Sequence, residues 1–153
     1  MMSKIVRTTA RFLTPAILLY GMYLIIHGHV SSGGGFQGGA VFASSAALLA
    51  VAFGSEQIAS FLKEHRLVAI SCSGALMFIG LGFAGMGTTF FFNVFAGSPL
   101  FGHIPAYGPN PEDIWTGGTV PLMNVGVALN VVAGLAAIVL AMAIASGKSG
   151  EDE

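Results

Sequence analysis

The chain reads HGHVSSGGGFQGG from His27 to Gly39, a glycine-rich turn between two long apolar stretches. Six glycines and two histidines lie in these thirteen residues, with no Asp, Glu, Lys or Arg among them. Glycine has no Cβ and lets neighbouring backbones approach closely, so a turn of this kind is typical of tightly packed membrane helices. We therefore predict that this segment is a close-packing joint between the first two helices.

The composition places the chain in a membrane. Of its 153 residues, 54% are hydrophobic and only 8% are charged, whereas a soluble domain carries about 25% charged residues. The net charge of −1 gives no reason to expect a nucleic acid partner. The single cysteine, Cys72, excludes an internal disulfide framework and a thiolate metal site.

Charged residues gather in four clusters, and each gap between clusters can hold the roughly 20 apolar residues that cross a bilayer. We predict an all-α, polytopic membrane protein with four transmembrane helices in a single domain, residues 1–153. The predicted spans are residues 9–28, 35–54, 67–87 and 120–145, with an external loop over residues 88–119. An alternative third span continues through residues 90–95. Pro15 is expected to kink the first span or to mark the end of a short interfacial helix.

Four spans put both termini and the loop around Lys63 and Arg66 on one side of the membrane. All six Lys and Arg residues then lie on that side, which the positive-inside rule assigns to the cytoplasm. The N-terminal stretch also resembles a signal peptide, but no small-x-small cleavage site follows Ile26, so we predict an uncleaved anchor. The expected location is the cell membrane, with the glycine-rich turn on the non-cytoplasmic face.

Small residues recur at helical spacing in three of the predicted spans, which favours close helix contacts. The rows are Gly35, Gly39, Ala43 and Ala47, then Ala46, Ala50 and Gly54, then Ala133, Ala137, Ala141 and Ala145. The third span carries the glycines Gly74, Gly80, Gly82, Gly85 and Gly87.

Two familiar site patterns are weak here. Gly33, Gly35 and Gly38 satisfy G-x-G-x-x-G, but a dinucleotide site needs a preceding strand, and this motif follows an apolar helix. A catalytic zinc takes three protein ligands, and His103 is the only histidine expected on the same face as His27 and His29. We predict no cofactor, metal or catalytic residues in this chain. The two turn histidines are expected to bind freed helix-end carbonyls, with proton transfer as an alternative.

The interiors of the predicted spans carry no Asp, Glu, Lys or Arg, although ion pumps normally do. The chain is therefore not expected to move ions by itself. One open alternative is a small stand-alone transporter. Another is a membrane enzyme with chemistry in the external loop, where His103 stands far along the sequence from the acidic pair Glu112 and Asp113. We predict that this acidic pair is solvated.

Two segments together resemble the MnhB family, a component of the multisubunit Mrp-type sodium/proton antiporters. The first is the opening motif, with Gly28, His29, Gly33, Gly34, Gly35, Phe36, Gly38 and Gly39. The second reads GTVPLMNVGV over residues 118–127. The resemblance covers most of the chain and implies a small accessory subunit that works only inside a large membrane assembly. Homologous modules occur in membrane-bound hydrogenases and related ferredoxin-oxidising respiratory complexes.

The resemblance implies other Mrp-type subunits as partners, possible hydrogenase subunits, and Na⁺ or H⁺ as the transported ion. Candidate ion-path or inter-subunit contacts are His27, His29, Pro121, Asn124, Gly126 and Asn130. Antiporter members usually carry Asn and Pro where Val30 and Ser32 stand, and many carry an acid where Asn124 stands. These departures favour the hydrogenase-type module, with a stand-alone Mrp antiporter as the alternative.

Overall fold

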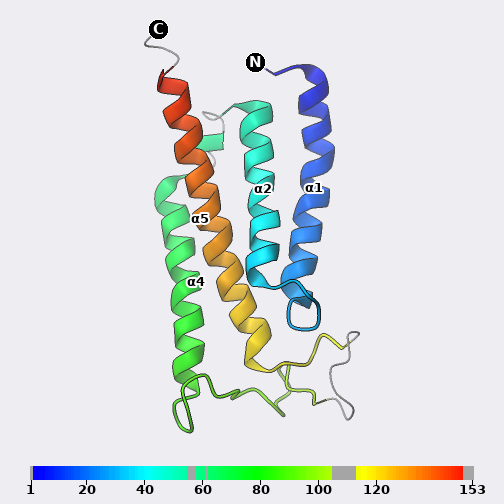
Figure 1. Cartoon of the computed structure of the whole chain (residues 1–153), viewed down its shortest axis with the longest axis vertical. Helices are drawn as coiled ribbons and strands as arrows, with labels where there is room; N and C mark the ends of the chain where they lie inside the picture. The colour runs from blue at the N-terminus through cyan, green and yellow to red at the C-terminus, as the bar shows by residue number, and fades with distance from the viewer. Residues whose placement is uncertain (1, 55–57, 61, 105–112, 150–153) are drawn as a thin grey trace.

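The computed structural model describes residues 2–54, 58–60, 62–104 and 113–149 and places four long helices in them (Figure 1). The helices are α1 (Lys4–His27), α2 (Gly35–Phe53), α4 (Glu64–Ala84) and α5 (Thr119–Ser149). Each is long and apolar enough to cross a membrane. The prediction of an all-α protein with four spans is therefore confirmed. Within the described ranges, the only strand-like feature is an isolated bridge between His103 and Thr116.

Helix α1 is continuous and starts earlier than the predicted span. It begins at Lys4, where the Ser3 hydroxyl accepts a hydrogen bond from the Val6 N–H at 3.4 Å. Pro15 lies inside α1 and does not divide it. The Thr14 hydroxyl donates to the Ala10 carbonyl at 2.7 Å, one turn back along the helix. A separate interfacial helix before Pro15 is therefore not present.

Helix α4 ends at Ala84, so the alternative third span through residues 90–95 is wrong. The chain turns back after Gly85, and the Phe91 N–H donates to the Gly82 carbonyl at 3.1 Å. Phe91 has a positive φ of 64°, a conformation that no helix contains. Helix α5 begins at Thr119 and continues to Ser149, past the predicted end at residue 145.

The helices pack in the order α1, α2, α5, α4 (Figure 1). Helix α1 packs on α2, and α5 packs between α2 and α4. The start of α1 and the end of α5 lie at one end of the bundle, and the glycine-rich turn lies at the other, together with the segment between α4 and α5. This arrangement places the described basic residues of α1 and α4 at one end, as the charge pattern predicts.

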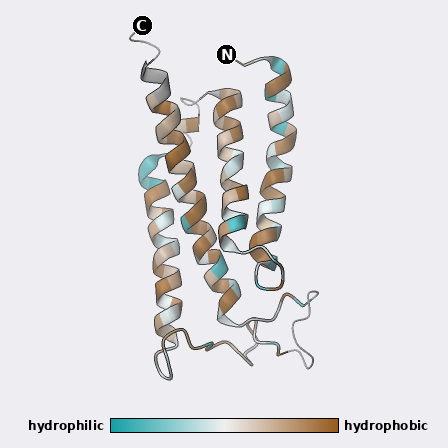
Figure 2. Ribbon diagram, in the orientation of Figure 1, coloured by the Kyte–Doolittle hydropathy of each residue, from teal (hydrophilic) through white to brown (hydrophobic). Residues whose placement is uncertain are grey.

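The interior of the bundle is built from small side chains. The buried cluster comprises Leu67, Ala133, Ala136 and Leu140, and no large side chain is fully buried among the described residues. Large apolar side chains cover the outside instead. Figure 2 shows that hydrophobic residues, coloured brown, occur along all four helices. A surface of this kind suits lipid or neighbouring membrane subunits rather than water.

Candidate functional site: the glycine-rich turn

The turn between α1 and α2 is closed by its own backbone. The N–H groups of Val30 and Ser31 both donate to the His27 carbonyl at 3.0 Å, which satisfies an acceptor left free at the end of α1. At the start of α2, the Gln37 side-chain oxygen accepts from the Gly34 N–H at 3.0 Å. The turn therefore carries defined caps at both ends and holds α1 and α2 in a fixed antiparallel pair.

Glycines at the contact between α1 and α2 let the two helices pack closely. A Cβ on Gly38 would lie 2.6 Å from Ile25 Cγ1 and 2.9 Å from the Gly21 carbonyl oxygen. A Cβ on Gly28 would lie 2.7 Å from Gly34 Cα. Contacts below 3.0 Å would force the two backbones apart. The helices can therefore pack this closely only with glycine at these positions.

Helix α5 meets the same joint, which the sequence did not predict. A Cβ on Gly35 would collide with the backbone carbonyl of Asn124, and one on Gly39 would lie 3.0 Å from Val131 Cβ. By contrast, a Cβ on Gly34 would make only ordinary contacts, the nearest at 3.5 Å to Gln37. The motif therefore joins three helices, and its glycines are not equivalent. Gly33 has an intermediate amount of room, because a Cβ there would lie 3.2 Å from Leu24 Cδ2.

Gly126 and Asn130, predicted as ion-path or inter-subunit contacts, lie where α5 packs on α4. A Cβ on Gly74 would lie 2.5 Å from the Gly126 carbonyl oxygen. The Asn130 side-chain amide donates to the Ser71 carbonyl at 3.2 Å. Both positions therefore hold α4 and α5 together within this chain.

The two turn histidines differ in their surroundings. The His27 ring pairs through Nδ1 with the Tyr23 carbonyl at 3.2 Å and stacks on the Tyr23 ring at 4.2 Å between centroids. The Tyr23 carbonyl is not one of the last four carbonyls of α1, so this contact differs from the expected one with a freed helix-end carbonyl. Both ring nitrogens of His29 are buried without a hydrogen bond of normal geometry. The His29 ring packs against Gly117, where a Cβ would lie 3.1 Å from its Cδ2.

Burial lowers the pKa of His29 below its ordinary value of 6.5, and the neighbouring His27 acts in the same direction. The backbone groups of Ile114 and Ile26 partly offset this effect. His29 is therefore neutral at neutral pH, with one nitrogen able to donate and the other able to accept.

Asn124 completes the polar part of the joint. Its side-chain nitrogen is buried without a hydrogen-bond partner and lies 3.0 Å from where a Cβ on Gly28 would stand. Pro121 is buried one turn earlier on α5, beside Gly117. Phe36 points outward and is 61% exposed. The structure thus brings His29, Asn124 and Pro121 to one end of the bundle, while Phe36 faces the surroundings.

Asn93, which sequence reasoning missed, ties the segment between α4 and α5 to the start of α5. Its side-chain amide donates to the Gly117 carbonyl at 3.0 Å. Its side-chain oxygen accepts from the Thr119 N–H at 2.8 Å and from the Thr119 hydroxyl at 3.2 Å. Asn93 therefore caps α5 from 26 residues away. A contact over this separation cannot be predicted from a local sequence pattern.

Asp113 is not solvated as predicted, because it pairs with His103. The two side chains are joined by a hydrogen bond, in which the Asp113 side chain is 19% exposed and the His103 side chain 65% exposed. The hydrogen bond from His103, helped by the Trp115 N–H, lowers the pKa of Asp113. Glu112, the other half of the predicted acidic pair, lies outside the described residues.

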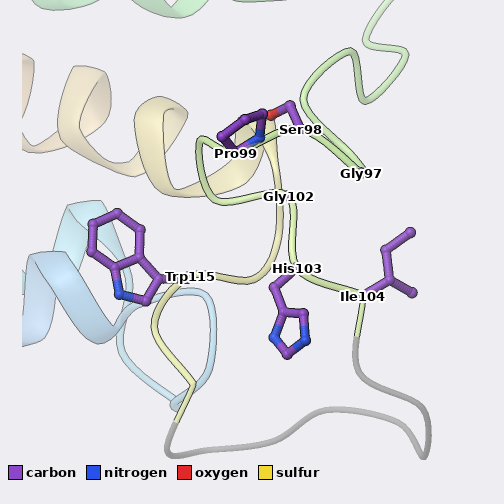
Figure 3. Close-up of a pocket in the computed structure, with 7 residues that line it drawn as sticks. All are labelled: Gly97, Ser98, Pro99, Gly102, His103, Ile104 and Trp115. Atoms are coloured by element: carbon purple, nitrogen blue, oxygen red, sulfur yellow. The ribbon is translucent and has the colours of Figure 1, made fainter.

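His103 also borders a cleft of about 500 Å³ lined by Gly97, Ser98, Pro99, Gly102, His103, Ile104 and Trp115 (Figure 3). In Figure 3 the side chains of His103, Ile104 and Trp115 point away from one another. The Ser98 hydroxyl donates to the Leu100 carbonyl at 3.1 Å and so is not directed at His103. Ser98 and His103 therefore do not form the nucleophile–base pair that the alternative of a membrane enzyme would need.

Among the described residues, no three His, Cys, Asp or Glu side chains come close enough together to hold a metal ion. Cys72 lies exposed on α4. The site is thus a glycine joint with two polar side chains that bury nitrogen atoms without a hydrogen bond of normal geometry, the two ring nitrogens of His29 and the amide nitrogen of Asn124. What this arrangement can do is hold three helices rigidly together and offer hydrogen bonds at the end of the bundle.

These features define a class: a small, polytopic, α-helical membrane protein whose spans meet through glycine. Residues 5–137 match the family described as a domain related to the MnhB subunit of a Na⁺/H⁺ antiporter. The match covers most of the chain, which therefore belongs to the MnhB family, as the two sequence segments predicted.

Individual relatives agree with this assignment. The chain is 29% identical to the putative antiporter subunit mnhB2 of Staphylococcus saprophyticus, over 95% of this chain and 96% of that protein. It is 30% identical to a Na⁺/H⁺ antiporter subunit of Bacillus subtilis, over 67% of this chain and 66% of that one. It is also 35% identical to an uncharacterized protein of Methanocaldococcus jannaschii, over 87% of this chain. The match spans about half of that longer relative, 49%.

Proposed function

We propose that this chain is an accessory integral-membrane subunit of a Mrp-type sodium/proton antiporter module. The observation that carries the proposal is the joint itself: four glycines of the motif, Gly28, Gly35, Gly38 and Gly39, lie where α1, α2 and α5 touch, within the segment that matches the family. The partners are the other subunits of the module, embedded with it in the cell membrane. The bundle end with the starts of α1 and α4 faces the cytoplasm, because the basic residues gather there.

The chain's own role is architectural. Close packing at the glycine-rich turn fixes the end of the bundle, while large exposed apolar side chains on the outer faces offer contact area to neighbouring subunits. In this proposal Gly126 and Asn130 serve the same purpose between α4 and α5.

A contribution to the path of Na⁺ or H⁺ is the second part of the proposal. His29 and Asn124 support it, because both place buried, unsatisfied hydrogen-bonding atoms at the non-cytoplasmic end. Such groups are commonly satisfied by water. A charged residue that drives transport would then come from a partner subunit, since none lies in the apolar interior of these spans.

The parent complex that we favour is a redox-driven respiratory complex of the membrane-bound hydrogenase type. The support is the neutral Asn124 at a position where many antiporter members carry an acid. A plain Mrp antiporter is the alternative parent complex.

The test is transport with and without the chain. We expect membrane vesicles from cells that lack this chain to lose sodium-dependent proton movement, and the wild-type chain to restore it. We also expect the purified chain alone in liposomes to move neither Na⁺ nor H⁺. Ion transport by the chain alone would contradict the proposal and support a small stand-alone transporter.

A further inference from the structure

The first turns of α1 carry three basic residues on one face. Lys4, Arg7 and Arg11 follow one another at spacings of three and four residues, which puts them in one stripe along the helix. The first turn holds no acidic residue. Basic side chains are unfavourable at a helix N-terminus, where the helix dipole is positive. The stripe therefore needs a negative partner from outside α1.

Two of these basic residues share one aromatic ring. The guanidinium carbons of Arg7 and Arg11 lie 5.8 and 5.6 Å from the centroid of the Phe53 ring, the last residue of α2. The end of α2 lies beside the first turns of α1 in Figure 1. One ring therefore lies close to two positive groups, and like charges repel. An anion placed against both groups would relieve this repulsion.

No such anion comes from the described part of this chain. Its one ion pair, His103 with Asp113, lies at the opposite end of the bundle. Arg7 Nε is buried without a partner, and neither guanidinium group makes a hydrogen bond or ion pair to a described residue. The two groups thus keep most of their donors for a ligand.

The stripe begins at the edge of the hydrocarbon core. Helix α1 has 24 residues and is therefore about 36 Å long, roughly 6 Å more than the hydrocarbon core of a bilayer. With His27 at the opposite edge of the core, this surplus places Lys4 and Arg7 where the headgroups begin and Arg11 one turn deeper. The long side chain of Arg11 can extend from that depth toward the headgroups, as basic side chains near the ends of membrane helices do.

We propose that Arg7 and Arg11, assisted by Lys4, bind the phosphodiester headgroup of an anionic phospholipid. A guanidinium group donates two parallel hydrogen bonds to phosphate oxygens, and two such groups one turn apart surround one phosphate. Basic pockets between transmembrane helices on the cytoplasmic side bind anionic headgroups in this way. The site lies at the opposite end from the glycine-rich turn and does not depend on the proposed transport function.

The experiment compares lipid retention by purified full-length variants. Each chain is placed in phosphatidylcholine nanodiscs containing a small fraction of phosphatidylglycerol, and the bound lipid is measured by native mass spectrometry. The test variant is Arg7→Gln with Arg11→Gln. Its matched control is Lys63→Gln with Arg66→Gln, which removes the same charge at the start of α4. We expect the test variant to bind phosphatidylglycerol about tenfold more weakly, since each basic residue near the membrane surface adds to the attraction for anionic lipid. The control should bind as the wild type does.

Equal losses in both double variants would overturn the proposal, because they would show diffuse attraction rather than a site. It would also be overturned if the wild type showed no preference for phosphatidylglycerol, as expected when the stripe binds an acidic side chain of another subunit. Displacement of the lipid by millimolar inorganic phosphate would indicate a free-anion site and contradict a lipid site. If the double Arg variant does not fold, Phe53→Leu keeps the charges and removes the ring. Retention unchanged in Phe53→Leu would then count against the proposal.

Discussion

Gly35 and Gly34 are adjacent in the sequence, yet only Gly35 lacks room for a side chain. A Cβ on Gly35 would collide with the Asn124 carbonyl of α5, whereas one on Gly34 finds its nearest neighbour at 3.5 Å. The backbone of Gly34 is extended, with φ −132°, which any residue adopts. The difference is therefore one of helix contact and not of backbone conformation.

This difference gives the first prediction. Gly35→Ala should destabilise the folded chain by about 1–3 kcal/mol, the usual cost of overpacking, because α2 and α5 must separate. Gly34→Ala should behave as the wild type. The measurement is thermal unfolding of each detergent-solubilised chain, followed by circular dichroism. Equal stability of the two variants would show that the contact between Gly35 and α5 is not what the turn provides.

His29 gives the second prediction. Because burial lowers its pKa in the folded chain, the unfolded chain binds the proton more tightly. Above the unfolded pKa, near 6.5, His29 is neutral in both states and does not lower the free energy of unfolding. As the pH falls below that value, the unfolded chain takes up the proton first, so the free energy of unfolding decreases. The melting temperature should therefore fall between about pH 7 and pH 5, and His29→Gln should reduce that fall. His65→Gln, at the other end of the bundle, is the control and should keep it.

Helix α5 depends on a side chain far from it in sequence. Asn93 makes three hydrogen bonds to Gly117 and Thr119, and two of them satisfy donors at the first residue of α5. The segment that follows α4 is thereby fastened against the end of the bundle, next to His29 and the glycine-rich turn.

We predict that Asn93→Ala destabilises the chain by about 1–3 kcal/mol, since it leaves part-buried donors without partners. Hydrogen exchange should quicken at the N–H of Thr119, while the centres of the four helices keep their protection. Ser98→Ala is the matched control, because the Ser98 hydroxyl makes its hydrogen bonds to the backbone of Leu100 within the same loop. Unchanged exchange at Thr119 would mean that Asn93 does not cap α5.

The four helices form a bundle whose two ends differ in chemistry. The starts of α1 and α4 carry the basic residues, and the teal turns in Figure 2 mark these starts. The opposite end holds the glycine-rich turn, the aromatic residues of the segment after α4 and the pair of His103 with Asp113.

The two ends should lie on opposite sides of the membrane. In a Cys72→Ala background, Ser31→Cys and Ser98→Cys should react with an impermeant thiol reagent added outside intact cells. Ser3→Cys should react only after the membrane is opened, because the proposed topology places the basic end in the cytoplasm. The reverse pattern would invert the proposed topology.

The number of helices was predictable because charge clusters and apolar gaps are properties of sequence alone. The glycine motif likewise predicted a close contact between α1 and α2, since only glycine allows two backbones to approach so closely. The third helix in that contact, α5, could not be foreseen, because Gly35 and Asn124 meet only after the bundle assembles. The roles of Asn93 and Asp113 were missed for the same reason: their partners lie far away in sequence or across an irregular loop.

We propose that this MnhB-family chain works as a subunit of an antiporter-like membrane assembly. Purification of the tagged chain in a mild detergent, followed by mass spectrometry of the chains that accompany it, tests this role. We expect co-purification of Mrp-type antiporter subunits, joined by hydrogenase or ferredoxin-oxidising subunits if the parent is a respiratory complex. Recovery of the chain alone, or with copies of itself only, would contradict this role.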